Sequence, residues 1–220
     1  MTIIKANSTE DRERVQKLYK FEEEVRREGY NLIAGVDEAG RGSLVGVLTV
    51  AAVILPENLY LPKLNDSKKI SAHIRENLYS EIVEKAIAFS CAEVSIEEID
   101  KLNIYQATLL GMKRAVKNLS VKPDFVLTDA MKLEFDDGIK SRSIVHGDAL
   151  SASIAAASII AKVTRDRLAD DWSKNFPQYG FEKNRGYGTK EHLAAIKKFG
   201  YSSIHRKSFN PVKNMIAENL

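Results

Sequence analysis

The stretch Gly35-Val36-Asp37-Glu38-Ala39-Gly40-Arg41-Gly42 places two adjacent carboxylates directly before a Gly-Arg-Gly turn. Just ahead of it, Leu32-Ile33-Ala34 predict a strand that runs into the acids. Acidic side chains at the carboxyl end of a strand can bind a metal ion, and glycines let the backbone approach a ligand closely. The stretch therefore predicts a strand that delivers Asp37 and Glu38 to a ligand site.

Two further acids follow predicted strands later in the chain. Asp129 ends the apolar run 125–128, and Asp148 follows the predicted strand end 144–147. Acids at three separate strand ends are typical of a magnesium-type site. Each acid taken alone is also explained as a turn residue or a helix N-cap, and Asp148 fits the cap of the helix that follows it.

Hydrophobic periodicity predicts helices and strands that alternate in part. Helices are expected over residues 9–28, 71–88, 103–119, 149–172 and 190–199, and strands over 31–37, 47–55, 89–94, 125–129 and 144–147. Residues 56–69 and 177–189 are expected to form loops, because they are rich in proline or glycine. This order predicts an α/β domain with a mixed sheet.

The charge of the chain is unevenly distributed. Residues 1–140 contain 20 Lys and Arg against 23 Asp and Glu, whereas residues 141–220 contain 13 against 7. A basic C-terminal third beside an acidic cluster suits a polyanion held over metal ions, although a solvated basic surface explains the same excess.

Cysteine usage and hydropathy favour a cytoplasmic protein. Cys91 is the only cysteine, which excludes an intramolecular disulfide and zinc sites built from cysteines. The most apolar stretch, residues 149–161, is too short to span a bilayer, and the polar start of the chain does not resemble a signal peptide. We therefore expect no membrane partner and a cytoplasmic location.

The glycines after the first strand are superficially similar to a dinucleotide-binding turn. In residues 40–46 the third glycine comes one position late for that motif. The two carboxylates ahead of the turn would also repel a pyrophosphate, so a nicotinamide-dependent enzyme is disfavoured.

Eight short motifs, in this order, are similar to those of type 2 ribonuclease H (ribonuclease HII). They are residues 35–42, Asp66-Ser67-Lys68-Lys69, 103–107, His146-Gly147-Asp148-Ala149, 153–157, 161–167, Gly186-Tyr187-Gly188-Thr189 and 205–209. The resemblance extends from about Leu32 to Val212. It implies a ribonuclease H-like fold with a central mixed five-stranded sheet flanked by helices.

The resemblance also implies an activity and a metal site. Members of the family cut on the 5′ side of a ribonucleotide in duplex DNA, and they cut the RNA strand of RNA–DNA hybrids, leaving 3′-hydroxyl and 5′-phosphate ends. Their metal-binding acids correspond to Asp37, Glu38, Asp129 and Asp148, all present here. Two ions of Mg²⁺ or Mn²⁺ are expected during catalysis. A non-catalytic binder of the same fold is the alternative, but a pure binder would gain from losing four acids near phosphates.

Substrate contacts carry over by position. In the family the Gly-Arg-Gly turn senses the 2′-hydroxyl, which assigns that role to Gly40, Arg41 and Gly42, and a tyrosine packing on the adjacent sugar corresponds to Tyr187. A loop aromatic tucked into the core is the alternative for Tyr187. Candidate phosphate contacts are Lys68, Lys69, Arg165, Lys183, Arg185 and Arg206, each of which is equally well explained as a solvated surface charge.

The ends of the chain and three substitutions complete the comparison with the family. We expect a helical extension over 1–30, a catalytic domain over 31–212 and a tail over 213–220. Ribonuclease HIII carries a folded domain before its catalytic domain and generally lacks the Gly-Arg-Gly arginine. Here only about thirty residues precede the first predicted strand, and Arg41 is present, so both features favour HII. Residues 210–220 contain no Gln-led, aromatic-ending clamp-binding peptide, and a monomer is expected. Ser43, Val45 and His146 depart from the usual family residues Pro, Ala and Lys without affecting the acids.

Overall fold

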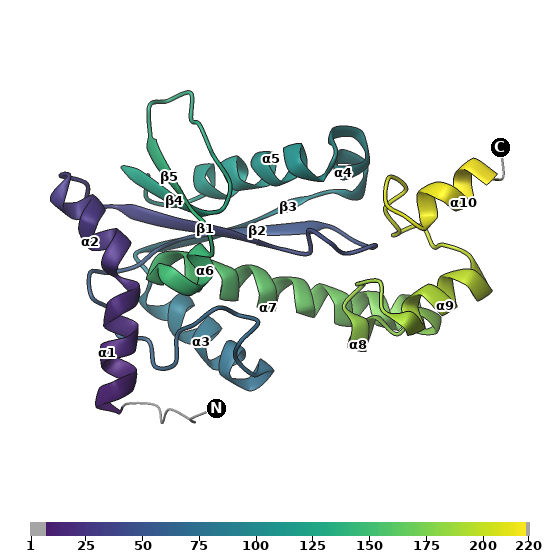
Figure 1. Cartoon of the computed structure of the whole chain (residues 1–220), viewed down its shortest axis with the longest axis horizontal. Helices are drawn as coiled ribbons and strands as arrows, with labels where there is room; N and C mark the ends of the chain where they lie inside the picture. Colours follow the sequence, from purple (N-terminus) through teal and green to yellow (C-terminus); the bar gives the residue numbers. More distant parts are fainter. Residues whose placement is uncertain (1–7, 219–220) are drawn as a thin grey trace.

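The computed structural model describes residues 8–218, which form a central sheet covered by helices on both faces (Figure 1). The strands are β1 (Ile33–Ala39), β2 (Leu48–Ile54), β3 (Ala88–Val94), β4 (Phe125–Asp129) and β5 (Lys140–Ile144). The helices are α1 (Thr9–Leu18), α2 (Lys20–Arg27), α3 (Ala72–Lys85), α4 (Ile96–Leu102), α5 (Ile104–Lys117), α6 (Gly147–Leu150), α7 (Ala152–Asn175), the 3-10 helix η1 (Pro177–Tyr179), α8 (Phe181–Asn184), α9 (Lys190–Phe199) and α10 (Val212–Glu218). Within the described part of the chain, no helix is long and apolar enough to cross a membrane.

The five strands lie in the order β3-β2-β1-β4-β5. β1, β2 and β3 pair antiparallel, whereas β4 runs parallel to β1 and β5 runs parallel to β4. This confirms the predicted mixed five-stranded sheet. The register pairs Val36 with Thr128, so Asp37 and Asp129 follow at neighbouring positions on the same edge.

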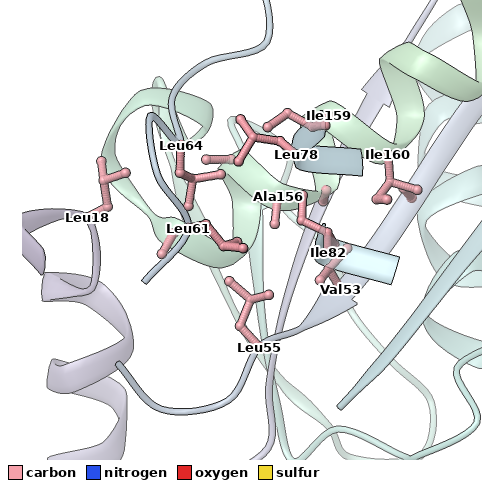
Figure 2. Packing of buried hydrophobic residues seen from close by; sticks show 14 of the residues in the cluster. Leu18, Val53, Leu55, Leu61, Leu64, Leu78, Ile82, Ala156, Ile159 and Ile160 are labelled. Atoms are coloured by element: carbon pink, nitrogen blue, oxygen red, sulfur yellow. The ribbon is translucent and has the colours of Figure 1, made fainter. Parts of the chain in front are cut away.

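Two apolar layers hold the helices against the sheet. Along β2 the side chains alternate, since Ala51 and Val53 belong to the cluster with α3 and α7, whereas Val50 and Ala52 belong to the cluster with α5. Figure 2 shows the first cluster, in which Val53 lies with the α3 and α7 residues Leu78, Ile82, Ala156, Ile159 and Ile160. Burial on both faces explains why the β2 sequence is almost continuously apolar.

The start of α7 approaches the backbone of β1 very closely at Gly35. A Cβ added to Gly35 would lie 2.1 Å from the backbone carbonyl carbon of Ser153 and 2.3 Å from the amide nitrogen of Ile154. Only glycine fits this crossing, because real Cβ atoms do not come so close to backbone atoms. This contact fixes the start of α7 against β1 at Gly35, which is two residues before Asp37 in the chain.

We expect Gly35→Ala to destabilise the protein by about 2 kcal/mol or more, because neither backbone can move aside cheaply. Urea unfolding followed by circular dichroism measures the change. Gly42→Ala is the matched control, since a Cβ there meets nothing within 4 Å. An unfolding free energy of Gly35→Ala equal to that of the control would contradict this packing.

Two predicted helices differ from the structure. The predicted helix over 9–28 is interrupted at Tyr19, whose buried side chain donates a hydrogen bond to the carbonyl of Leu59 (2.7 Å). The helix predicted to reach Ala88 ends at Lys85, because Ala88 pairs with Ile54 and begins β3. In both places a long-range contact overrides the local helical pattern.

The segment around Asp148 also differs. The strand predicted over 144–147 is wrong, since β5 ends at Ile144 and His146 has the left-handed conformation (φ 60°, ψ 36°). The long helix predicted from Ala149 is divided at Ser151, whose hydroxyl accepts from the amide of Ile154 (3.3 Å) and donates to Glu22 (2.6 Å). Residues 213–218 of the expected tail belong to α10, a helix that no sequence pattern predicts.

Candidate metal centre and nucleic-acid site

Three carboxylates meet at the edge of the sheet. Asp37 comes from β1, Asp129 from the end of β4 and Asp148 from α6. One oxygen from each lies within 4.8 Å of the others. Asp37 and Asp148 are only 5% and 6% exposed, so these acids are held in the protein rather than solvated. The structure thus brings together three of the four predicted metal ligands, and Glu38 follows Asp37 directly.

Backbone amides orient the acids. The amide of Glu38 donates to Asp37 Oδ1 (2.7 Å), and the amide of Gly147 donates to Asp129 Oδ1 (2.7 Å). The second bond depends on the left-handed turn at His146, which ends β5 and begins α6. Asp148 therefore reaches the cluster from a helical turn, where sequence analysis had expected the end of a strand.

The cluster is electrostatically unfavourable without a counter-ion. Burial raises the pKa of Asp37 well above its ordinary value, and the charges of Glu38 and Asp129 raise it further. Burial also raises the pKa of Glu38 against the opposing charge of Arg41, and it raises the pKa of Asp129 despite the Gly147 hydrogen bond. Such a set of oxygen donors suits a hard divalent cation, which would remove the repulsion.

A cavity of about 420 Å³ joins the acids to the Gly-Arg-Gly turn. Its lining consists of Asp37, Glu38, Ala39, Gly40, Arg41, Gly42, Ser67, Lys68, Lys162 and Tyr187. Predicted metal ligands and predicted substrate contacts therefore face one space, although they come from distant parts of the sequence. Ser67 and Lys162 were not predicted as site residues, and the only signal for them was their place in the two family motifs.

Two buried arginines, Arg165 and Arg206, support the backbone of the Gly-Arg-Gly turn. Gly40 has φ 91°, and a Cβ there would lie 1.9 Å from Arg165 Nε. The Arg206 guanidinium donates to the carbonyls of Arg41 (3.1 Å), Gly46 (2.9 Å) and Val47 (3.2 Å). Gly42, by contrast, is exposed and open. The turn is thus fixed on one side and free on the side of the cavity.

Arg165 does not lie where a phosphate contact requires. Its side chain is buried, donates to the carbonyls of Arg185 (2.9 Å) and Val45 (3.2 Å), and has its guanidinium carbon 5.6 Å from the centre of the Tyr187 ring. The predicted phosphate contacts at Arg165 and Arg206 are therefore wrong, because these charges support the backbone around the turn. Sequence alone does not distinguish a buried arginine from an exposed one.

Lys68 and Tyr187 do reach the cavity. Lys68 Nζ lies 3.3 Å from Asp148 Oδ2. Burial lowers the pKa of Lys68, but the charges of Asp148, Asp37 and Asp66 and the hydrogen bond to Asp148 together outweigh burial and raise it. The Tyr187 side chain is 38% exposed, so it is not tucked into the core. Both residues are placed to meet a substrate that enters the cavity.

Comparison with known proteins identifies the family of this chain. The family model for ribonuclease HII matches residues 34–212. Ribonuclease HII of Bacillus cytotoxicus is 53% identical over 216 residues, which cover 98% of this chain and 83% of the relative. The fold is similar to that of ribonuclease H2 from Pyrococcus horikoshii (TM-score 0.72, 23% identity, 86% of this chain and 98% of the other). It is also similar to a structure of the PCNA–ribonuclease HII complex from Archaeoglobus fulgidus (TM-score 0.69, 25% identity, 82% of this chain and 96% of the other). The chain belongs to the ribonuclease HII family and is a ribonuclease H endonuclease.

Proposed function

We propose that this protein cuts on the 5′ side of a ribonucleotide within duplex DNA and also cuts the RNA strand of RNA–DNA hybrids. The observation that carries the proposal is the single cavity in which Asp37 and Glu38 face the Gly-Arg-Gly turn and Tyr187. A site that reads the sugar beside a set of acidic ligands can place one particular phosphate for hydrolysis.

The four acids are proposed to hold two divalent cations, Mg²⁺ or Mn²⁺, with Asp37 central. When bound, the ions would supply an activated water and charge stabilisation at the departing 3′ oxygen. The protein's own contribution is orientation, since the Glu38 and Gly147 amides fix the carboxylates before metal arrives. Lys68, beside Asp148, is placed to attract a phosphate toward the acids.

Sugar recognition is proposed to come from the turn and from Tyr187. The open side of Gly42 lets the backbone approach a 2′-hydroxyl, and the braced Gly40 and Arg41 keep the turn in place during that contact. The half-exposed ring of Tyr187 is placed to pack on the neighbouring deoxyribose. Backbone contacts to a hydroxyl discriminate RNA from DNA without reading the base.

We expect cleavage of a labelled RNA–DNA hybrid with Mg²⁺ or Mn²⁺ and none with EDTA. The products should carry 3′-hydroxyl ends, which a polymerase extends, and 5′-phosphate ends, which a ligase joins. Cleavage that persists in EDTA would contradict the metal assignment. Products with 3′-phosphate or cyclic phosphate ends would instead indicate attack by the 2′-hydroxyl.

The remaining proposals concern organisation of the protein. Residues 31–212 are proposed as the catalytic domain, with 1–30 as a helical extension and 213–220 as a tail, of which residues 1–7 and 219–220 lie outside the described part of the chain. The protein is proposed to be cytoplasmic, in keeping with its composition and its single cysteine. It is proposed to act as a monomer, as the family resemblance implies.

We expect no binding to a sliding clamp through residues 210–220, because this segment lacks a Gln-led, aromatic-ending peptide. A pull-down with immobilised clamp should recover no more of the full chain than of a chain ending at residue 209. Clamp binding that is lost on removal of residues 210–220 would overturn this expectation.

A further inference from the structure

Two buried histidines, His192 and His205, lie beside the backbone of Tyr187. They belong to the part of the chain around α9, which lies near the C-terminal end of α7 (Figure 1). His192 is in the first turn of α9, and His205 is in the segment that follows α9. They are 0% and 1% exposed, and their Nε2 atoms are 3.2 Å apart. The rings of Tyr179 and Phe181 pack around them. Neither histidine lines the cavity, so neither has a direct role in the chemistry proposed above.

The hydrogen bonds around the pair fix both tautomers. The Ser202 amide donates to His205 Nδ1 (2.9 Å), so the His205 proton must be on Nε2. His205 Nε2–H then donates to His192 Nε2, which places the His192 proton on Nδ1. His192 Nδ1–H donates to the carbonyl of Tyr187 (3.0 Å). The result is one chain of hydrogen bonds, all in the same direction, from Ser202 to Tyr187.

This chain requires both imidazoles to be neutral. Burial lowers the pKa of His192, and burial together with the His192 charge lowers the pKa of His205 to about 4. Both rings therefore keep the donor and acceptor pattern of the chain at neutral pH. A network satisfied at every link is rigid, because any rotation leaves a buried group without a partner.

The same histidine segment is attached to the Gly-Arg-Gly turn. His205 forms an isolated bridge with Val45, and the Arg206 amide donates to the carbonyl of Leu44 (2.9 Å). Arg206 also donates to the carbonyl of Arg41 (3.1 Å). Residues 205 and 206 thus connect the backbone of Tyr187 on one side with the Gly-Arg-Gly turn on the other.

We propose that the His192–His205 pair is a positioning device that holds Tyr187 at a fixed place relative to the Gly-Arg-Gly turn. The inference rests on the proposed role of Tyr187 in contacting the sugar. It adds two residues to the determinants of specificity, although neither touches the substrate. A displacement of Tyr187 by about 1 Å is enough to cost on the order of 10²-fold in rate. The loss of cleavage rate should be largest for substrates that need the Tyr187 contact, namely single ribonucleotides in DNA.

A matched pair of substitutions separates positioning from packing. In His192→Asn the side-chain amide occupies the place of Nδ1 and can still donate to the Tyr187 carbonyl. In His192→Gln the amide occupies the place of Nε2, so the link to His205 is kept and the link to Tyr187 is lost. We expect His192→Gln to lower kcat/KM on a single ribonucleotide at least about tenfold relative to a long hybrid. His192→Asn should keep the wild-type ratio of the two rates.

The control is Tyr187→Ala, alone and combined with His192→Gln. If the pair acts through Tyr187, then His192→Gln has no further effect on the ratio once the ring is removed. Equal ratios for the Asn and Gln variants, or effects that multiply with Tyr187→Ala, would overturn the inference and leave the proposed function standing. An unchanged ratio for Tyr187→Ala alone would overturn the proposed role of Tyr187, and the inference with it.

One further measurement covers poor folding of His192→Gln. Long-range ¹H–¹⁵N spectra of the wild-type imidazoles should show the proton on Nδ1 of His192 and on Nε2 of His205. The opposite tautomers would contradict the hydrogen-bond chain.

Discussion

Asp37→Asn is expected to lower cleavage by on the order of 10³-fold, because an amide cannot replace the central carboxylate of the metal site. The same variant should be more stable than the wild type in EDTA. Burial, Glu38 and Asp129 raise the pKa of Asp37, so its charged form opposes folding of the metal-free protein at neutral pH. The substitution is therefore expected to raise the melting temperature while abolishing activity.

The pH dependence of the stability follows from the same raised pKa of Asp37. Between the unfolded pKa of Asp37 and its raised folded pKa, the metal-free folded state binds more protons than the unfolded state. The free energy of unfolding in EDTA should therefore fall as pH rises through this window, and less steeply in Asp37→Asn. Mg²⁺ should raise the melting temperature of the wild type but not of the variant. Asp136→Asn is the matched control, since Asp136 is exposed and does not belong to the cluster of acids. An Asp37→Asn protein that cuts at the wild-type rate would contradict the metal assignment.

Gly42→Ala is expected to reduce cleavage at a single ribonucleotide by about 10²-fold without loss of stability. In the free protein a Cβ at Gly42 meets nothing within 4 Å, and its φ lies outside the left-handed region. The unfolding free energy should therefore stay within about 0.5 kcal/mol of wild type or rise slightly. Gly42 lines the cavity, however, and the added methyl group is expected to hold the sugar away from the backbone.

Gly40→Ala provides the contrast within the same turn. Gly40 has φ 91°, and its Cβ would collide with Arg165, so this variant should lose both stability and activity. Urea unfolding together with steady-state cleavage separates the two glycines. A Gly42→Ala enzyme with wild-type kcat/KM on a single ribonucleotide would contradict recognition by the backbone of the turn.

The parts of the site that could be predicted from sequence lie on locally coded elements. β1 and β4 are apolar runs that end in acids, so periodicity located Asp37 and Asp129 before any contact was known. The mixed sheet confirms the expected fold, and the cavity beside Asp37 and Glu38 is lined by Gly40, Arg41, Gly42 and Tyr187.

What sequence could not give depends on contacts distant in the chain. β5 is a half-exposed edge strand with little apolar alternation, so its predicted end is misplaced, and Asp148, expected directly after a strand end, lies in α6. Arg165 reads as a surface charge, but it is buried by residues from the turn and from the Tyr187 loop. The His192–His205 link joins residues 13 apart that share no periodic pattern. Such pairings appear only once the tertiary structure is known.

The most direct test uses a labelled DNA duplex that contains one ribonucleotide, incubated with Mg²⁺, with Mn²⁺ and with EDTA, and with the cut mapped to the nucleotide. The proposed function predicts a single nick on the 5′ side of the ribonucleotide that disappears in EDTA. No nick in this duplex under conditions that cleave a long RNA–DNA hybrid would contradict it, because the Gly-Arg-Gly turn and Tyr187 would then not confer recognition of a single ribonucleotide.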